Sequence, residues 1–89
     1  MSKYKLEYTQ QAVKQLSKFD KYVQKLIYAW IDKNLKDCKD PRAFGKGLTS
    51  NSSGQWRYKI GDYRIIADIQ DEKVTILLLE IGHRRSIYD

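Results

Sequence analysis

Basic residues are concentrated in the last third of this sequence, at spacings that place several of them on one face of a β-sheet. Residues 55–60 alternate between polar and apolar side chains, and the Gly-Asp pair at 61–62 separates them from a second alternating stretch. This pattern predicts a hairpin with a two-residue loop. In that register Lys59 lies directly opposite Arg64, and Arg57 shares their face.

Two like charges opposed across neighbouring strands destabilise a sheet, typically by a few tenths to about 1 kcal/mol. One interpretation is that these side chains reach into water or pair with Asp68 or Glu80. The other is that they form a site for an anion. The C-terminal segment favours the second, because we expect Gly82 to end or bend the preceding strand and turn the following residues toward the same face. Those residues are His83, Arg84, Arg85 and Tyr88.

Such a cluster of cations with a phenol suits a phosphodiester whose negative charge grows in the transition state. The sequence shows no paired carboxylates, no histidine-rich cluster and no glycine-rich phosphate loop, so we expect no metal and no cofactor. The chemistry that fits is metal-free cleavage of RNA. There the 2′-hydroxyl is the nucleophile, and the protein orients it, stabilises charge and moves protons.

Composition agrees with a nucleic-acid partner. Seventeen Lys and Arg against eleven Asp and Glu give a net charge of +6, which attracts polyanions, although basic surface also simply maintains solubility.

The 89 residues suit one domain, 1–89, with a single small site. Cys38 is the only cysteine, which excludes an internal disulfide. The N-terminus lacks a signal peptide, and no apolar run is long enough to span a bilayer, so we expect a soluble, cytoplasmic protein with no membrane partner.

The elements that position the cations follow from hydrophobic periodicity. Residues 4–8 alternate like a half-buried strand. Thr9 is placed to cap a first helix, and Asp20 a second, long amphipathic helix whose apolar residues run from Val23 to Leu35. Residues 37–54 contain the only proline and three of the five glycines and predict a loop, with a short helical turn near Arg42–Phe44 or a functional role for the loop.

The remaining residues predict strands. Residues 55–60, 63–69 and 74–81 form a meander, with a second tight turn at residues 71–72. The order β-α-α-β-β-β predicts an α+β fold made of an N-terminal strand, a helical hairpin and a three-stranded antiparallel meander. We expect one antiparallel sheet with both helices on one face. Trp30 and Trp56 fall in apolar rows and are expected in the core.

The stretches Gly54–Arg64 (GQWRYKIGDYR) and Ile81–Tyr88 (IGHRRSIY) together resemble the RelE branch of the RelE/ParE toxin superfamily. The similarity extends over the opening strand, the helical hairpin and the Asp40–Leu48 loop. It implies a type II toxin that enters the ribosomal A site and cleaves mRNA by 2′-hydroxyl attack, inhibiting translation. It also implies a RelB-like antitoxin as partner.

The resemblance assigns roles to individual residues. Lys59, Arg64 and Arg84 match basic residues around the scissile phosphate, and Tyr88 matches a C-terminal tyrosine that transfers a proton or stacks on a base. Arg57 stands where some members have lysine, and an arginine is a poor general base. His83 is therefore a further catalytic candidate, since imidazoles titrate near neutral pH, unless it is an ordinary strand-end residue. The remaining RNA-binding candidates are Arg85 and Lys46.

Two other function classes share these features. A ParE-type toxin has the same fold but inhibits DNA gyrase, and it does not need the combination of Lys59, Arg64, Arg84 and Tyr88. A non-catalytic nucleic-acid-binding module needs only the charge and the sheet, with the tail as a phosphate-contacting arm. Cleavage of ribosome-bound mRNA distinguishes all three.

Overall fold

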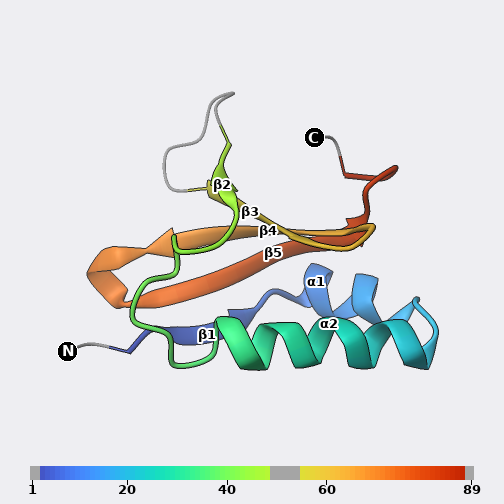
Figure 1. Cartoon of the computed structure of the whole chain (residues 1–89), viewed down its shortest axis with the longest axis horizontal. Helices are drawn as coiled ribbons and strands as arrows, with labels where there is room; N and C mark the ends of the chain where they lie inside the picture. The colour runs from blue at the N-terminus through green and yellow to red at the C-terminus, as the bar shows by residue number, and fades with distance from the viewer. Residues whose placement is uncertain (1–2, 49–54, 88–89) are drawn as a thin grey trace.

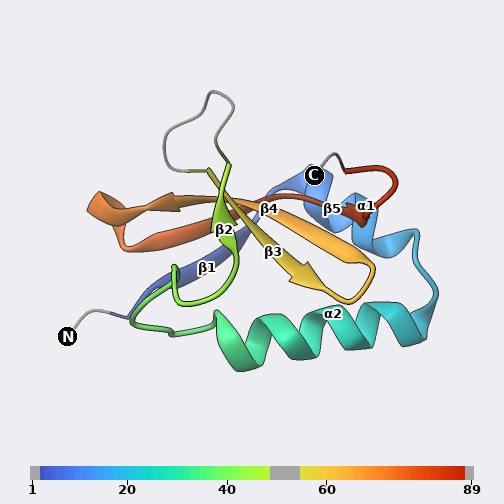
Figure 2. The ribbon, with the colours of Figure 1, turned by 45° about the horizontal axis from the view of Figure 1, so that its top comes forward.

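The computed structural model describes residues 3–48 and 55–87. A five-stranded sheet with the order β1-β5-β4-β3-β2 carries both helices on one face (Figures 1 and 2). Among the described residues, no helix has the length and apolar composition needed to cross a membrane. The elements are β1 (Lys5–Tyr8), α1 (Gln10–Ser17), α2 (Lys21–Asn34), β2 (Lys46–Gly47), β3 (Gln55–Ile60), β4 (Tyr63–Gln70), the 3₁₀ turn η1 (Asp71–Lys73) and β5 (Thr75–His83).

Both predicted helix caps are confirmed. The Thr9 hydroxyl accepts a hydrogen bond from the Ala12 backbone N–H at 3.0 Å, and the Asp20 carboxylate accepts one from the Val23 N–H at 2.9 Å. These side chains satisfy N–H groups that the first turn of a helix leaves without a partner. The caps therefore fix where α1 and α2 begin, and with that how their apolar sides meet the sheet.

The hydrophobic core lies between the helices and the sheet. α2 contributes Ile27 and Ile31 from its buried side, while the sheet contributes alternate residues of β3, β4 and β5. Trp30 and Trp56 pack against this core as partly buried residues. The fully buried members with the largest side chains are Tyr58, Leu16, Ile27, Ile31, Leu35, Ile65, Ile76, Leu78 and Ile81.

The predicted β3–β4 hairpin forms in the expected register. Ile60 pairs with Tyr63, and Lys59 pairs with Arg64. Gly61 takes a φ of +57° at the first loop position, a conformation that glycine adopts without steric cost and that tight hairpins favour. The charge arrangement predicted from this register is therefore present in the structure.

The α+β class is confirmed, but the sheet is mixed rather than wholly antiparallel. β1 pairs with β5 in parallel, with Leu6 opposite Ile76, whereas the other pairs are antiparallel. A parallel pair needs a long crossover connection, and here residues 9–74 lie between the two strands. The alternation of residues 4–8 predicted a strand and its buried face correctly, but alternation carries no information on direction.

The loop between α2 and β3 differs from the prediction in two respects. Lys46 and Gly47 form the short strand β2, which pairs antiparallel with β3. The predicted helical turn is a single tight turn, in which the Ala43 N–H donates to the Asp40 carbonyl at 3.2 Å. Residues 49–54 of this loop lie outside the described part of the chain.

The strand boundaries of the last hairpin also differ. Val74, expected as the first strand residue, adopts a left-handed conformation with φ +49° at the end of η1, so β5 begins at Thr75. Gly82 does not end the strand. It pairs with Arg64, and β5 continues to His83.

Candidate functional site

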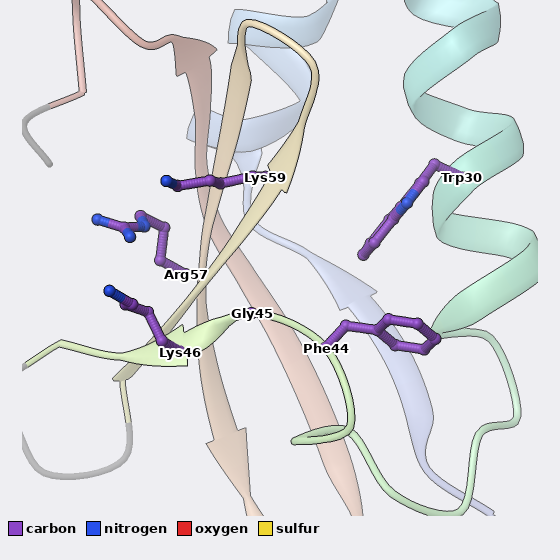
Figure 3. Close-up of a pocket in the computed structure, with 6 residues that line it drawn as sticks. All are labelled: Trp30, Phe44, Gly45, Lys46, Arg57 and Lys59. Atoms are coloured by element: carbon purple, nitrogen blue, oxygen red, sulfur yellow. The ribbon is translucent and has the colours of Figure 1, made fainter.

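Three basic side chains of the β3–β4 hairpin share the face of the sheet opposite the helices. Arg57 lies two residues before Lys59, which is opposite Arg64, and Lys46 of β2 pairs with Arg57. Figure 3 shows Lys46, Arg57 and Lys59 extending to the same side, away from Trp30 on α2. We call Lys46, Arg57, Lys59 and Arg64 the cationic face.

The two arginines of the cationic face are held in place before any ligand binds. Arg57 is 5% exposed and Arg64 is 6% exposed, whereas Lys59 is exposed. One guanidinium nitrogen of Arg64, Nη1, donates to the carbonyls of Gly61 and Tyr63 at 2.9 and 3.0 Å. A cation fixed in this way stabilises developing negative charge without having to reorganise.

The segment after β5 folds back over the sheet because residue 82 is glycine. A Cβ atom on Gly82 would come within 3.1 Å of the Ile87 side chain, which is only 8% exposed and therefore occupies that space. The N–H groups of Ser86 and Ile87 both donate to the His83 carbonyl, at 2.8 and 3.0 Å, and make the turn. In Figure 1 this segment rises from the end of β5 on the side of the sheet opposite α2. The described part of the tail therefore folds over the face that carries Arg64, which pairs with Gly82, although the strand does not end at Gly82 as predicted.

Arg84 is positioned by the hairpin loop. Its backbone N–H donates to the Asp62 carbonyl at 2.7 Å, and its Nε lies 3.6 Å from Asp62 Oδ1. Arg64 bonds to the neighbouring Gly61 carbonyl, so both arginines are anchored on the same two-residue loop. The structure thus brings Arg84 to the hairpin as expected, and it adds Asp62, which sequence reasoning treated only as a turn residue.

His83 is not brought to the cationic face. It pairs with Tyr63, and their rings meet edge to face with centroids 5.5 Å apart. The Tyr63 ring also packs against the ring of Phe19, a residue between the two helices, with centroids 5.2 Å apart. Because His83 packs on the same tyrosine, it lies on the face of the sheet that carries the helices. Its Nδ1 accepts the Arg85 backbone N–H at 3.2 Å. Tyr88 lies outside the described residues, and Arg85 is exposed in the turn before it.

The loop that leads into β2 is fastened to the body of the protein by a charged cluster. Arg42 donates two hydrogen bonds of 3.1 Å to the Asp71 carboxylate, and the Tyr4 hydroxyl donates one of 2.7 Å. These hydrogen bonds, of which the one from Arg42 has the largest effect, hold the pKa of Asp71 below its usual value. The cluster joins the loop to the turn between β4 and β5.

Two aromatic residues of β3 hold the same loop from the helix side. The Tyr58 hydroxyl donates to the Pro41 carbonyl and the Trp56 indole N–H donates to the Phe44 carbonyl, each at 2.5 Å. Burial of Tyr58 raises the pKa of its hydroxyl, which therefore stays protonated as a donor. Gly45 follows with φ +77°, and a Cβ there would overlap the Arg57 carbonyl. These contacts fix the position of Lys46.

A pocket of about 350 Å³ opens at the edge of β3, next to the cationic face (Figure 3). Sequence reasoning missed its aromatic members, Trp30 and Phe44. The available signal was the placement of Phe44 between Arg42 and Lys46 in a loop, since basic residues interleaved with an aromatic are typical of nucleic-acid sites. The lining residues are Trp30, Phe44, Gly45, Lys46, Arg57 and Lys59.

The cationic face and Arg84 suit a particular kind of chemistry. Guanidinium and ammonium groups hold an anion and stabilise further negative charge on it. An arginine is always protonated and does not act as a base. The arrangement therefore suits a reaction whose nucleophile is supplied by the substrate.

Comparison with known proteins identifies relatives over most of the chain. Residues 6–88 match a family model described as the ParE toxin of the type II toxin–antitoxin system parDE. Toxin RelG from Mycobacterium tuberculosis is 34% identical over 50 residues, which is 56% of this chain. The chain spans 58% of the length of RelG, less than two thirds of that relative.

Solved structures share the fold. The toxin–antitoxin complex RelBE2 from Mycobacterium tuberculosis superimposes with a TM-score of 0.76 at 27% identity, covering 94% of each chain. The isolated RelE toxin of E. coli gives a TM-score of 0.73 at 22% identity over 90% of this chain and 83% of that one. The archaeal RelE–RelB complex from Pyrococcus horikoshii gives 0.71 at 24% identity, covering 92% and 96%. The last two similarities concern the fold alone.

Proposed function

The chain belongs to the ParE toxin family of type II toxin–antitoxin systems, within the RelE/ParE superfamily, and from this premise we propose that it is a RelE-type toxin. It cleaves mRNA in the ribosomal A site and inhibits translation. The observation that carries this proposal is the cationic face, where Lys59 and Arg64 are directly opposed and Arg57 lies beside them. A like-charge pair that costs stability makes physical sense as a site for the phosphate of a polyanion.

The proposed reaction uses the RNA 2′-hydroxyl as nucleophile. Its oxygen forms a bond to phosphorus while the bond to the 5′-oxygen breaks, leaving a 2′,3′-cyclic phosphate and a 5′-hydroxyl. One proton leaves the 2′-hydroxyl and another reaches the 5′-oxygen. Negative charge grows on the phosphate oxygens in the transition state, and Lys59, Arg64 and Arg84 are assigned to stabilise it. No metal or cofactor has a role in this scheme.

We assign roles to the remaining candidate residues from their positions in the fold and from the family resemblance. Arg57, Lys46 and Arg85 bind the RNA backbone. Tyr88 is the proposed proton donor or stacking group, on the family resemblance. His83 lies on the helix side with its Nδ1 occupied by a backbone N–H, which argues against a part in proton transfer.

A ribosome-bound mRNA and a RelB-like antitoxin are the proposed partners, and the cytoplasm is the proposed place of action. RelE structures similar to this chain include complexes with RelB. A domain of this size leaves apolar surface uncovered, such as Val13 and Leu26 on the helices, and a partner chain would bury it.

The test is primer-extension mapping of mRNA in a cell-free translation system supplied with the purified protein. We expect cuts within the A-site codon, and far weaker cleavage of the same RNA without ribosomes, because so small a site aligns its substrate poorly on its own. Efficient cleavage of naked RNA, or intact mRNA in the presence of folded protein, would contradict the proposal.

The matching family model favours a second candidate, inhibition of DNA gyrase. It predicts blocked supercoiling in a purified gyrase assay while mRNA on ribosomes stays intact. The two assays on one preparation of the protein distinguish the candidates.

A further inference from the structure

The pocket at the edge of β3 has two chemically different walls. Trp30 and Phe44 form an aromatic wall on the helix side. The other wall is lined by Lys46, Arg57 and Lys59, whose charged ends extend away from the aromatic wall to the opposite side of β3 (Figure 3). β2 pairs with β3 only as far as Arg57, so the described part of β2 leaves the edge of β3 open beside Lys59. This opening joins the aromatic wall to the cationic face.

The aromatic wall is built before any ligand arrives. The Phe44 ring packs edge-on against Trp30 with centroids 5.9 Å apart, and Trp30 packs on the buried Tyr58 at 5.6 Å. The Trp56 indole holds the Phe44 carbonyl. The Phe44 side chain nevertheless remains 44% exposed, so much of an anchored aromatic surface faces solvent.

The dimensions and charge of the pocket indicate the class of ligand. Its volume of about 350 Å³ is at the lower end of the usual range for small-ligand sites, about 300 to 1,000 Å³. Among the described lining residues there are three cations and no acid. Gly45 lies between the walls without a side chain to divide them. A ligand that fits has a flat apolar part and an anionic part.

We propose that this pocket is a nucleotide slot, in which a base of single-stranded RNA stacks on Phe44 beside Trp30 while the attached phosphate lies toward Lys46 and Lys59. The inference rests on the proposed function and extends it, because the slot would hold a nucleotide next to the one that is cleaved. Every base has a flat face, so stacking holds RNA with little dependence on sequence. The slot therefore positions the message along the cationic face.

Photocrosslinking on ribosomes tests the slot directly. The probe is an mRNA with 5-iodouridine at single positions in and beside the A-site codon and a 2′-deoxynucleotide at the cleavage site, which prevents the reaction. After irradiation and digestion, mass spectrometry locates the crosslinked residue. We expect a crosslink to Phe44 or Trp30 from one nucleotide position. If no nucleotide position gives a crosslink to Phe44 or to Trp30, the proposal is wrong.

Substitutions provide the second measurement. Phe44→Leu keeps apolar bulk but removes the ring, and we expect the toxin concentration for half-maximal single-turnover cleavage to rise roughly 5- to 30-fold, the lower part of the range for losing a stacking aromatic. Phe44→Tyr should restore binding. Tyr22→Leu is the matched control, since Tyr22 is 76% exposed on α2 and does not line the pocket.

The outcomes separate this inference from the proposed function. If the unsubstituted protein does not cleave ordinary mRNA on the same ribosomes, the proposed function fails, whereas crosslinking reports on the slot independently. If the crosslinks avoid both Phe44 and Trp30, and Phe44→Leu leaves cleavage unchanged but weakens neutralisation by the antitoxin, the pocket holds a protein segment and the nucleotide slot is wrong.

Discussion

Lys59 and Arg64 face each other directly across the β3–β4 hairpin, on the side of the sheet away from the helices. Arg64 is almost fully buried and bonded to the hairpin loop, whereas Lys59 is exposed. The guanidinium of Arg64 is therefore held at the hairpin loop. Directly opposed like charges generally destabilise a sheet, so replacing either charge should reveal a conflict between stability and activity.

Lys59→Gln should stabilise the fold but reduce the cleavage activity. We expect the free energy of unfolding to rise by about 0.2–1 kcal/mol, since a like-charge pair is removed from directly opposed positions. Cleavage should fall on the order of 10²–10³-fold, as when one preorganised donor is lost. Chemical denaturation and single-turnover cleavage measure the two effects. Lys73→Gln, at an exposed turn position, is the control for a change of net charge and should alter neither.

Arg84→Ala should lower the cleavage rate far more than ribosome binding. The expected loss is on the order of 10²–10³-fold in rate, whereas losing one of many phosphate contacts weakens binding modestly and reduces its salt dependence. Asp62→Asn is informative beside it, because it removes the exposed ion pair with Arg84 but keeps the backbone hydrogen bond. We expect Asp62→Asn to retain most activity. Equal rates for Arg84→Ala and the unsubstituted protein would remove Arg84 from the site.

The register of the β3–β4 hairpin was predictable because a two-residue loop determines which residues pair. The face of the sheet on which His83 lies was not predictable from the sequence. Near η1, Gln70 pairs with Thr75 and Ala67 with Leu78, and continuing that register would place residue 82 opposite Tyr63. An irregularity between Ile66 and Ala67 shifts the pairing by one residue, so Tyr63 meets His83 instead. A one-residue shift moves a side chain to the other face, and the apolar run in β5 gives no sign of it.

The aromatic wall of the pocket was unpredictable for a related reason. Trp30 follows the apolar periodicity of α2 and does pack against the core, as predicted. Its exposed edge and the ring of Phe44 come together only because hydrogen bonds from Tyr58 and Trp56 draw the loop onto the helix side of β3. Long-range contacts of this kind leave no periodic pattern in the sequence.

Gly45→Ala should damage the site more than the same change at Gly61. Both glycines have positive φ, and an alanine there costs about 1–2 kcal/mol from backbone conformation. At Gly61 the added methyl group meets nothing within 4 Å, whereas at Gly45 it overlaps the Arg57 carbonyl. We therefore expect a larger loss of unfolding free energy for Gly45→Ala, together with reduced cleavage as Lys46 is displaced. Denaturation of both variants checks this, and equal losses would contradict it.

Asp71 should make stability depend on pH in the acid range. Because Arg42 and Tyr4 hold its pKa below the unfolded value of about 3.9, its contribution is fully present above that value and disappears as pH falls through the lowered folded value. The unsubstituted protein should thus exceed Asp71→Asn in unfolding free energy by a constant amount above about pH 5, and the difference should shrink below about pH 4. Urea denaturation from pH 3 to 7 measures it. Glu72→Gln, next in sequence, should leave the dependence unchanged.

His83→Gln addresses the proton-transfer step. The His83 ring lies against Tyr63 on the helix side, and its Nδ1 already accepts the Arg85 N–H, so we expect single-turnover cleavage by the variant to keep the pH profile of the unsubstituted protein. Glutamine keeps a polar side chain able to accept that hydrogen bond, which protects the turn that carries Arg84. The measurement is the single-turnover rate on ribosome-bound mRNA from pH 5.5 to 9, where chemistry limits the rate.

Tyr88→Phe is the companion variant, because it keeps a ring for stacking and removes the hydroxyl. If the tyrosine transfers a proton, its loss should lower the rate on the order of 10²–10⁴-fold, the usual contribution of a positioned acid or base, while a stacking role predicts little change. Should His83→Gln instead lose a titration near neutral pH that Tyr88→Phe retains, the histidine is the proton carrier. The β4–β5 register would then have to shift by one residue in the bound state, since only that shift moves His83 to the face where Lys59 and Arg64 lie.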